Sequence, residues 1–318
     1  MKHLYVCACE ADGGIWHYQE SQGQWSLIDR LPLDRPMYMI MKKSHAFCLL
    51  REMDQASHYG GVLRLKTGKN GSLQPDGLPQ SSLGVVPCHL AAVDNKVYVT
   101  NYLSGTVVRI PDMVRTHTGH GVNPLRQEAP HPHFITPAPD GTLLCTDLGL
   151  DAIVAYDQNL NEQYRLVLPP GSGPRHLAFA EEGQILLCIG EMSCSISLFR
   201  RLAGGWKLVQ TLPLLDRVLP TYGAAAIRVW RDEVYTSIRG ADVIVRASLK
   251  NQELQILESV PCEGKSPRDI LWFDGKLYSA NENSGSVTVF TLRHGRLKQL
   301  ENETMHLPHP LCICALKA

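Results

Sequence analysis

Histidines, arginines and carboxylates occur beside short apolar segments at several places in the chain. The clearest stretch is PHPHFITPAPDGTLLCTD, which begins at residue 130, and a similar stretch, GPRHLAFAEEGQILLCIGE, begins at residue 173. The residues concerned are His131, His133, Asp147, Arg175, His176 and Glu191. Imidazole and carboxylate groups transfer protons, and guanidinium groups bind anions through paired donors. If the fold brings these side chains together, they could bind an anionic ligand and carry out acid–base chemistry.

The apolar segments have the pattern of β-strands. KVYVTN, TLLCTD, QILLCIG and KLYSAN are short, rich in β-branched, aromatic and aliphatic residues, and bounded by Gly, Asp, Asn or Pro. We find no long segment with a sustained 3.6-residue apolar period, which an amphipathic helix would require. The sequence therefore predicts an all-β protein.

A repeat decides which all-β fold to expect. Each unit starts at a proline or glycine before an apolar segment, and these starts lie 42 to 51 residues apart. They are Pro36, Pro87, Pro132, Pro174, Gly223, Pro267 and Pro310. This spacing is typical of a four-stranded propeller blade. The last unit ends after one strand, so we expect the N-terminal strands to complete it. The prediction is one seven-bladed β-propeller domain over residues 1–318, closed by the C-terminal strand.

In such a propeller, two positions of each blade meet at one mouth of the central channel. One is the start of the first strand, and the other is the loop after the second strand. The first position contributes Cys88, His89, His133, Arg175, His176, Arg268 and Asp269. The second position contributes Asn101, Tyr102, Asp147, Glu191, Arg239, Asn281 and Glu282, and the first two blades add Glu10 and Arg51. This mixture of cations, imidazoles and carboxylates suits an anionic small molecule and proton transfer.

These residues also have simpler interpretations. A charged residue in a β-turn is usually only solvated, and Asp147 could merely cap its own DLGLD turn. Arg175 and His176 follow the sequence GSG, where the backbone could approach a ligand closely. At the rim of a channel, Arg175 should pack against few neighbours. The recurrence of such residues in several blades favours the functional interpretation.

Composition narrows the class of partner and the compartment. The formal net charge is +0, whereas a nucleic-acid-binding protein needs a basic face. No apolar run is long enough to span a membrane, and the N-terminus lacks the apolar core of a signal peptide. Ten cysteines, four of them at one repeat position in separate units, predict free buried thiols and a cytoplasmic location. Equivalent positions in different blades should be too far apart for disulfides. We find no four-ligand metal pattern and expect no metal; the oligomeric state is left open.

Several motifs in combination resemble a known family. GPRHLAF, PHPH, TDLGLD, SIRGAD and PRDILWFDGKLYSANENSGSVTVF are similar to segments of the bacterial seven-bladed lactonase family. That family includes the propeller-type 6-phosphogluconolactonases and is related to carboxymuconate lactonizing enzymes. The resemblance covers residues 87–290 best. It is thinner over residues 36–65 and departs at Ala226, where relatives often have an acid.

The resemblance implies hydrolysis of 6-phosphogluconolactone in the oxidative pentose phosphate pathway, without a cofactor. It implies catalytic roles for His133, Arg175 and Glu191. His133 or Glu191 could take the proton from water, Arg175 could stabilise the oxyanion, and Arg239 or Arg268 could bind the phosphate. The remaining candidates for substrate binding are His89, His131, Asp147, His176 and Glu282. Two alternatives stay open: a muconate-type cycloisomerase, and a propeller that binds a ligand or protein without catalysis.

Overall fold

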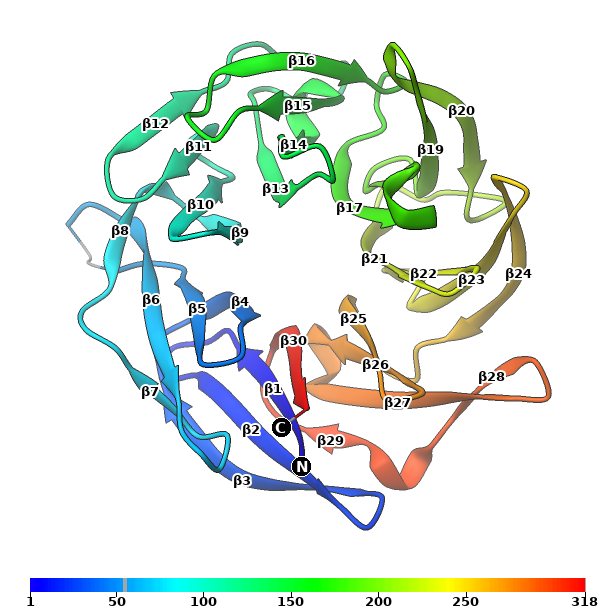
Figure 1. Ribbon diagram of the computed structural model, residues 1–318. Coiled ribbons are helices and arrows are strands. Elements are labelled where there is room, and N and C mark those ends of the chain that lie inside the picture. Colours follow the sequence, from blue (N-terminus) through cyan, green and yellow to red (C-terminus); the bar gives the residue numbers. More distant parts are fainter. Residues whose placement is uncertain (54–55, 318) are drawn as a thin grey trace.

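Seven antiparallel sheets surround a central channel (Figure 1). The innermost strand is the first of its sheet in chain order in six of them, and the C-terminal strand in the remaining one. The computed structural model describes residues 1–53 and 56–317. We number the sheets as blades one to seven. Blade one consists of β3 (Gln24–Pro32), β2 (Gly14–Ser21), β1 (Lys2–Ala8) and β30 (Pro310–Lys317). Blade two consists of β4 (Pro36–Met41), β5 (His45–Leu50), β6 (Tyr59–Thr67), β7 (Leu73–Pro75) and β8 (Gln80–Val85).

The other five blades follow in chain order. Blade three has β9 (Pro87–Val93), β10 (Lys96–Asn101), β11 (Thr106–Arg109) and β12 (Met113–Thr116). Blade four has β13 (Pro132–Pro137), β14 (Leu143–Asp147), β15 (Ala152–Tyr156) and β16 (Glu162–Val167). Blade five has β17 (Pro174–Ala180), β18 (Ile185–Gly190), β19 (Ser195–Leu202) and β20 (Gly205–Pro213). Blade six has β21 (Gly223–Trp230), β22 (Glu233–Arg239), β23 (Val243–Lys250) and β24 (Glu253–Pro261). Blade seven has β25 (Pro267–Phe273), β26 (Lys276–Asn281), β27 (Ser286–Arg293), β28 (Arg296–Gln299) and β29 (Met305–His306).

Helical structure in the described residues is limited to four short 3₁₀ turns. They are η1 (Leu148–Leu150), η2 (Glu181–Gly183), η3 (Glu282–Ser284) and η4 (Glu301–Glu303). None of the helices in this part of the chain is long and apolar enough to span a membrane. The predicted seven-bladed, all-β architecture is therefore confirmed.

The predicted closure is also confirmed. β30 pairs with β1 antiparallel from Lys2 opposite Lys317 to Ala8 opposite Pro310, so both ends of the chain share blade one. Figure 1 shows β30 beside β1 at the inner edge of that blade. This pairing supplies the inner strand of blade one and joins the two ends of the chain within one sheet.

Each inner strand begins at the residue predicted from the repeat, and in every blade except blade six a β-bulge lies directly after that residue. In blade six the register shifts farther along, between Ala224 and Ile227. In blades four and five, for example, the register shifts at His133 and at Arg175, which have no single partner on the second strand. A bulge re-aims the side chain of the extra residue. In six blades this residue lines one narrow pocket at the channel mouth: Met37, Cys88, His133, Arg175, Arg268 and Leu311. The bulges thus direct side chains from different blades into one pocket.

All ten cysteines are free thiols, and most are buried. Cys7, Cys48, Cys145 and Cys188 occupy second strands, as the repeat predicts. The expectation that such cysteines lie far apart is wrong for one pair. The Cys7 thiol lies beside those of Cys48 and Cys312, because blades one and two are neighbours and Cys7 faces Cys312 across the β1–β30 pair.

Candidate active site

The channel mouth opens into a cavity of 310 Å³ whose lining carries an excess of positive charge. Five arginines and one carboxylate line it, together with His133. The arginines are Arg51, Arg126, Arg175, Arg239 and Arg268, and the carboxylate is Glu191. They come from blades two, four, five, six and seven and from one inter-blade connection. An excess of guanidinium groups in a concave site is suited to an anionic ligand.

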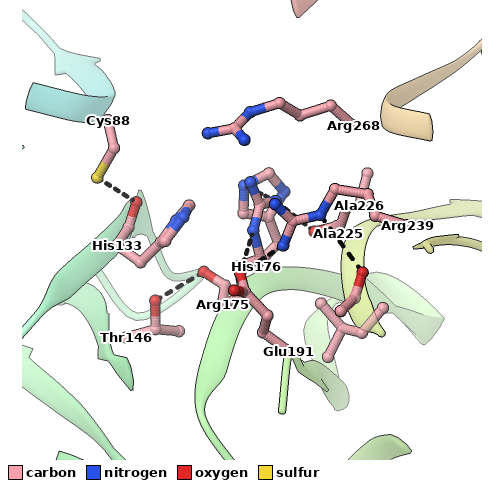
Figure 2. Close-up of polar contacts among 12 residues, drawn as sticks. Cys88, His133, Thr146, Arg175, His176, Glu191, Ala225, Ala226, Arg239 and Arg268 are labelled. Carbon is pink, nitrogen blue, oxygen red and sulfur yellow. Dashed lines mark hydrogen bonds and ion pairs between the residues drawn. The ribbon is translucent and has the colours of Figure 1, made fainter. Parts of the chain in front are cut away.

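Glu191 lies at the centre of an arginine cluster on one side of this cavity. Its Oε2 atom is 2.9 Å from Arg175 Nε and 2.9 Å from Arg239 Nη2, and its Oε1 atom is 2.6 Å from Arg126 Nη2. The Arg126 contact is a hydrogen bond, and the Arg239 contact is an ion pair, whereas the Arg175 Nε–H is near the carboxylate without hydrogen-bond geometry. Figure 2 shows Arg175 and Arg239 above Glu191, and Arg268 farther up, with its guanidinium pointing toward the side where His133 lies.

The charge states of this cluster follow from burial and from the neighbouring groups. Burial alone would raise the pKa of Glu191, but Arg239, Arg175 and the other cations outweigh it and hold the pKa well below its usual range. Burial and the nearby charge of Arg239 lower the pKa of Arg175 to about 9, so this guanidinium stays charged at neutral pH. Glu191 is therefore an ionised anchor for three cations and a poor proton acceptor.

The histidines of the channel are uncharged. Burial, followed by the charge of Arg175, places the pKa values of His133 and His176 well below 6.5. Their rings lie 5.5 Å apart, and Arg175 Nη1 donates to His176 Nε2 over 3.0 Å. The Nδ1 atoms of His133 and His176 are buried without a hydrogen-bond partner. A neutral imidazole beside a cavity can accept a proton, so His133 is the better candidate for a general base.

Arg175 is positioned by its own backbone and by the neighbouring blades. Thr146 Oγ1 donates to the Arg175 carbonyl over 2.8 Å, and Arg175 Nη1 donates to the Ala225 carbonyl over 2.5 Å. Only 3% of its side chain is exposed. The expectation of a rim residue with few neighbours is therefore wrong, because the bulge turns Arg175 into the channel.

The GSG turn before Arg175 has a structural role. The amides of Gly171 and Gly173 donate to the two carboxylate oxygens of Asp151, over 2.7 and 2.8 Å. Both glycines have positive φ angles, which favour glycine. The backbone thus approaches Asp151, from the TDLGLD motif of blade four, and not the cavity as the sequence suggested.

Asp147 is completely buried away from the cavity. Its Oδ1 atom accepts from the amides of His131, Gly149 and Leu150, and its Oδ2 atom is 2.6 Å from His117 Nδ1. The structure thus corrects its predicted place at the mouth. The carboxylate caps its own turn, as the alternative interpretation held, because the residue that pairs with the start of β13 points between the blades.

Sequence reasoning missed Arg126, which lies in the connection between β12 and β13. This connection, residues 117–131, is held at both ends by Asp147 through His117 and the His131 amide. Gln127 fixes its middle: its side chain donates to Leu148 O and accepts from the Asn123 amide. The unusual length of the connection was the signal available, since long ordered loops often carry functional residues.

The other predicted residues divide between the cavity and its surroundings. Arg239 and Arg268 line the cavity, and His176 lines the narrow pocket below it. His89 is buried, with its ring tilted against those of Tyr38 and Phe134 and its Nδ1 accepting from the Ile135 amide. His131 stacks on Tyr102 and donates through Nδ1 to its carbonyl. Glu282 is 3.4 Å from Arg268 Nη1 and is absent from the cavity lining.

Among the described residues, we find no group of three or more histidine, cysteine or acidic side chains arranged to hold a metal ion.

Comparison with known proteins agrees with this fold. The model of the family described as "Lactonase, 7-bladed beta-propeller" matches residues 3–315. The 6-phosphogluconolactonase of Bacillus subtilis is 29% identical over 308 residues, which covers 88% of this chain and 87% of the relative. The structure of a periplasmic gluconolactonase from Pseudomonas aeruginosa superposes with a TM-score of 0.89, at 21% identity, over 99% of each chain.

A second solved structure shows that the propeller alone does not define the chemistry. Virginiamycin B lyase from Staphylococcus aureus superposes with a TM-score of 0.63 and 15% identity, over 94% of this chain and 88% of the lyase. The fold is shared, but the family assignment rests on the sequence match across nearly the whole chain. The protein belongs to the lactonase family of seven-bladed β-propellers and is a lactone-hydrolysing enzyme.

Proposed function

We propose that this enzyme hydrolyses 6-phosphogluconolactone to 6-phosphogluconate, the lactonase step of the oxidative pentose phosphate pathway. The observation that carries the proposal is the cavity lined by five arginines and one carboxylate, beside an uncharged His133. A phosphorylated sugar lactone is a small anion that needs hydrolysis and no redox chemistry. The similarity to the 6-phosphogluconolactonase of B. subtilis supports the same substrate.

In this proposal His133 is the general base. Its imidazole accepts a proton from a water molecule, whose oxygen forms a bond to the lactone carbonyl carbon. The carbonyl π electrons move onto oxygen, and Arg175 stabilises the oxyanion. When the carbonyl re-forms, the bond to the ring oxygen breaks, and that oxygen takes the proton back from His133. The product is the open-chain sugar acid, and His133 returns to its neutral state.

Glu191 acts in this scheme by holding the arginines. Three guanidinium groups so near to one another would repel, and the carboxylate between them offsets that repulsion. Because its pKa is held so low, Glu191 stays ionised throughout the reaction. Arg175 thus keeps both its charge and its direction while the oxyanion forms.

We also infer that the enzyme works in the cytoplasm. The support is chemical: all ten cysteines are free thiols, three of them side by side in blades one and two. In an oxidising compartment such neighbouring thiols tend to form disulfides. A periplasmic relative of the same fold exists, so the compartment needs a direct test by fractionation of the source cells.

Hydrolysis of freshly prepared 6-phosphogluconolactone, measured against its spontaneous hydrolysis, tests the proposal. We expect the purified enzyme to accelerate the reaction strongly and to leave a muconate-type lactone unchanged. His133→Asn should lower kcat/KM on the order of 10²-fold or more, as for loss of a general base. His120→Asn, at an exposed histidine of the 117–131 connection, is the matched control. A wild-type rate equal to the spontaneous rate would overturn the proposal, and turnover of the muconate lactone alone would favour the cycloisomerase.

A further inference from the structure

The two sides of the cavity differ in how far their arginines are neutralised. On the side of blades five and six, Arg175, Arg239 and Arg126 share Glu191 at 2.6–2.9 Å. On the other side lie Arg51, which follows β5 in blade two, and Arg268, the bulge residue of blade seven. A ligand anion gains most from cations that no carboxylate already satisfies.

Carboxylates neutralise the charges of Arg51 and Arg268 only weakly. The contact between Arg268 and Glu282 is 3.4 Å long, and both side chains are about a quarter exposed, so it is a weak pair. Arg51 is exposed, and no ion pair joins it to a carboxylate among the described residues. These two guanidinium groups therefore provide the least compensated positive charge of the cavity.

Arg51 and Arg268 also lie close enough to act on one ligand. Blade one separates their blades, and Cys9 lies there, directly after β1. Both arginines act on the Cys9 thiol electrostatically: burial raises its pKa to about 11, and the two cations oppose that rise. Both arginines line the same cavity, and Arg268 also lines the narrow pocket with His133 and Arg175. An anion held between them would keep the attached ring next to His133.

A neighbouring pocket is the competing location for the anionic group. It has a volume of 380 Å³ and shares Arg126, Glu191 and Arg239 with the cavity. Its own charged residues are Lys265 and Asp242, so it contains three cations and two carboxylates. The cavity has five cations and one carboxylate and therefore attracts a dianion more strongly.

We propose that Arg51 and Arg268 form a clamp for the phosphomonoester of the substrate, and that Arg51 determines the preference for phosphorylated over neutral sugar lactones. This inference rests on the proposed function. It assigns the phosphate to Arg268 and not to Arg239, whose charge is already shared with Glu191. It also gives a role to a residue from blade two, where the repeat is poorest.

The test compares two substrates in matched variants. Initial rates above the spontaneous reaction are measured with 6-phosphogluconolactone and with glucono-1,5-lactone. For Arg51→Gln we expect kcat/KM on the phosphorylated lactone to fall 10- to 100-fold, mainly through KM, because a uniform binding contact is lost. The ratio of kcat/KM between the two lactones should fall at least tenfold. Arg51→Lys should restore part of this preference, and Lys265→Gln, in the neighbouring pocket, should change the ratio less than about twofold.

A binding measurement separates this inference from the proposed function. Calorimetry with 6-phosphogluconate and with gluconate needs no turnover, and Arg51→Gln should weaken only the binding of the phosphorylated acid. The inference is overturned if Arg51→Gln affects both lactones or both acids equally, or if Lys265→Gln removes the preference. A wild-type protein that hydrolyses neither lactone refutes the proposed function, whereas the two binding constants still test the clamp. Thermal melts identify any variant that fails to fold.

Discussion

Asp147 and Glu191 are buried carboxylates next to the ends of second strands in neighbouring blades, yet their surroundings are opposite. Asp147 receives three backbone amides and one imidazole, whereas Glu191 receives three guanidinium groups. The difference is one residue of register. Asp147 pairs with Pro132, the first residue of its inner strand, but in blade five the partner of Pro174 is Gly190. Glu191 is one step farther along and turns toward the channel mouth.

Other blades follow the same rule. Asn101 and Asn281 pair with Pro87 and Pro267, as Asp147 does with Pro132, and both are fully buried. The next residues, Tyr102 and Glu282, lie at the cavity or against one of its arginines. Arg239 is the exception, because it pairs with Gly223 but reaches Glu191 through its long side chain. In these blades, the residue that pairs with the first residue of the inner strand is buried within the blade structure. The residue that follows it lies at the candidate site.

The largest effect that tests this division is on stability. Asp147→Ala leaves three buried amides and His117 without their acceptor, so we expect the free energy of unfolding to fall by about 3 kcal/mol or more. Urea unfolding gives this value. Asp157→Ala is the matched control, because Asp157 caps an exposed turn through the amides of Asn159 and Asn161 and should matter much less. Equal losses in the two variants would break the comparison.

The next effect is on catalysis. Glu191→Gln removes the only negative charge among three arginines, so Arg175 loses its direction and kcat/KM should fall on the order of 10²-fold. Asp147→Asn is measured at a temperature where it is folded. The factor by which its kcat/KM falls should be less than a tenth of the factor for Glu191→Gln. If Asp147→Asn has the greater effect on activity, the assignment of the two carboxylates is wrong.

A smaller loss is expected at Arg126, the most exposed of the three arginines. Its side chain is 46% exposed, against 3% for Arg175, so water screens its charge better. Arg126→Gln should lower kcat/KM roughly tenfold, and Arg126→Lys should recover part of it. Arg115→Gln is the control, because Arg115 hydrogen-bonds the Leu160 carbonyl at the outer edge of the ring. A loss at Arg126 as large as that at Glu191 would mean that this cation takes part in the chemical step.

The finest test is the pH dependence of kcat/KM. A general base acts in its neutral form, and burial together with Arg175 lowers the pKa of His133 well below 6.5. Activity should therefore persist as the pH falls below 6.5 and decline only when His133 becomes protonated. Glucono-1,5-lactone suits this measurement, because it has no phosphate that titrates in the same range. An acid limb at or above pH 6.5 would exclude His133 as the base.

Much of this protein is determined by local sequence. The strand pattern, the seven anchors from Pro36 to Pro310 and the incomplete last unit predicted the blades, their number and their closure, because hydrophobic alternation and turn residues act over a few positions. The same repeat predicted that His133, Arg175, Glu191, Arg239 and Arg268 approach one channel mouth. Side chains at equivalent repeat positions lie at equivalent places in a propeller.

Only the tertiary structure decided what those residues do there. Whether a carboxylate faces amides or guanidinium groups depends on a bulge and on one residue of register, as in Asp147 and Glu191. Arg126 belongs to no repeat position, and it reaches Glu191 because contacts from blade four hold residues 117–131 in place. The low pKa of His133 comes from burial by several blades and from the charge of Arg175 in blade five. These features arise between residues distant in sequence, so no local pattern encodes them.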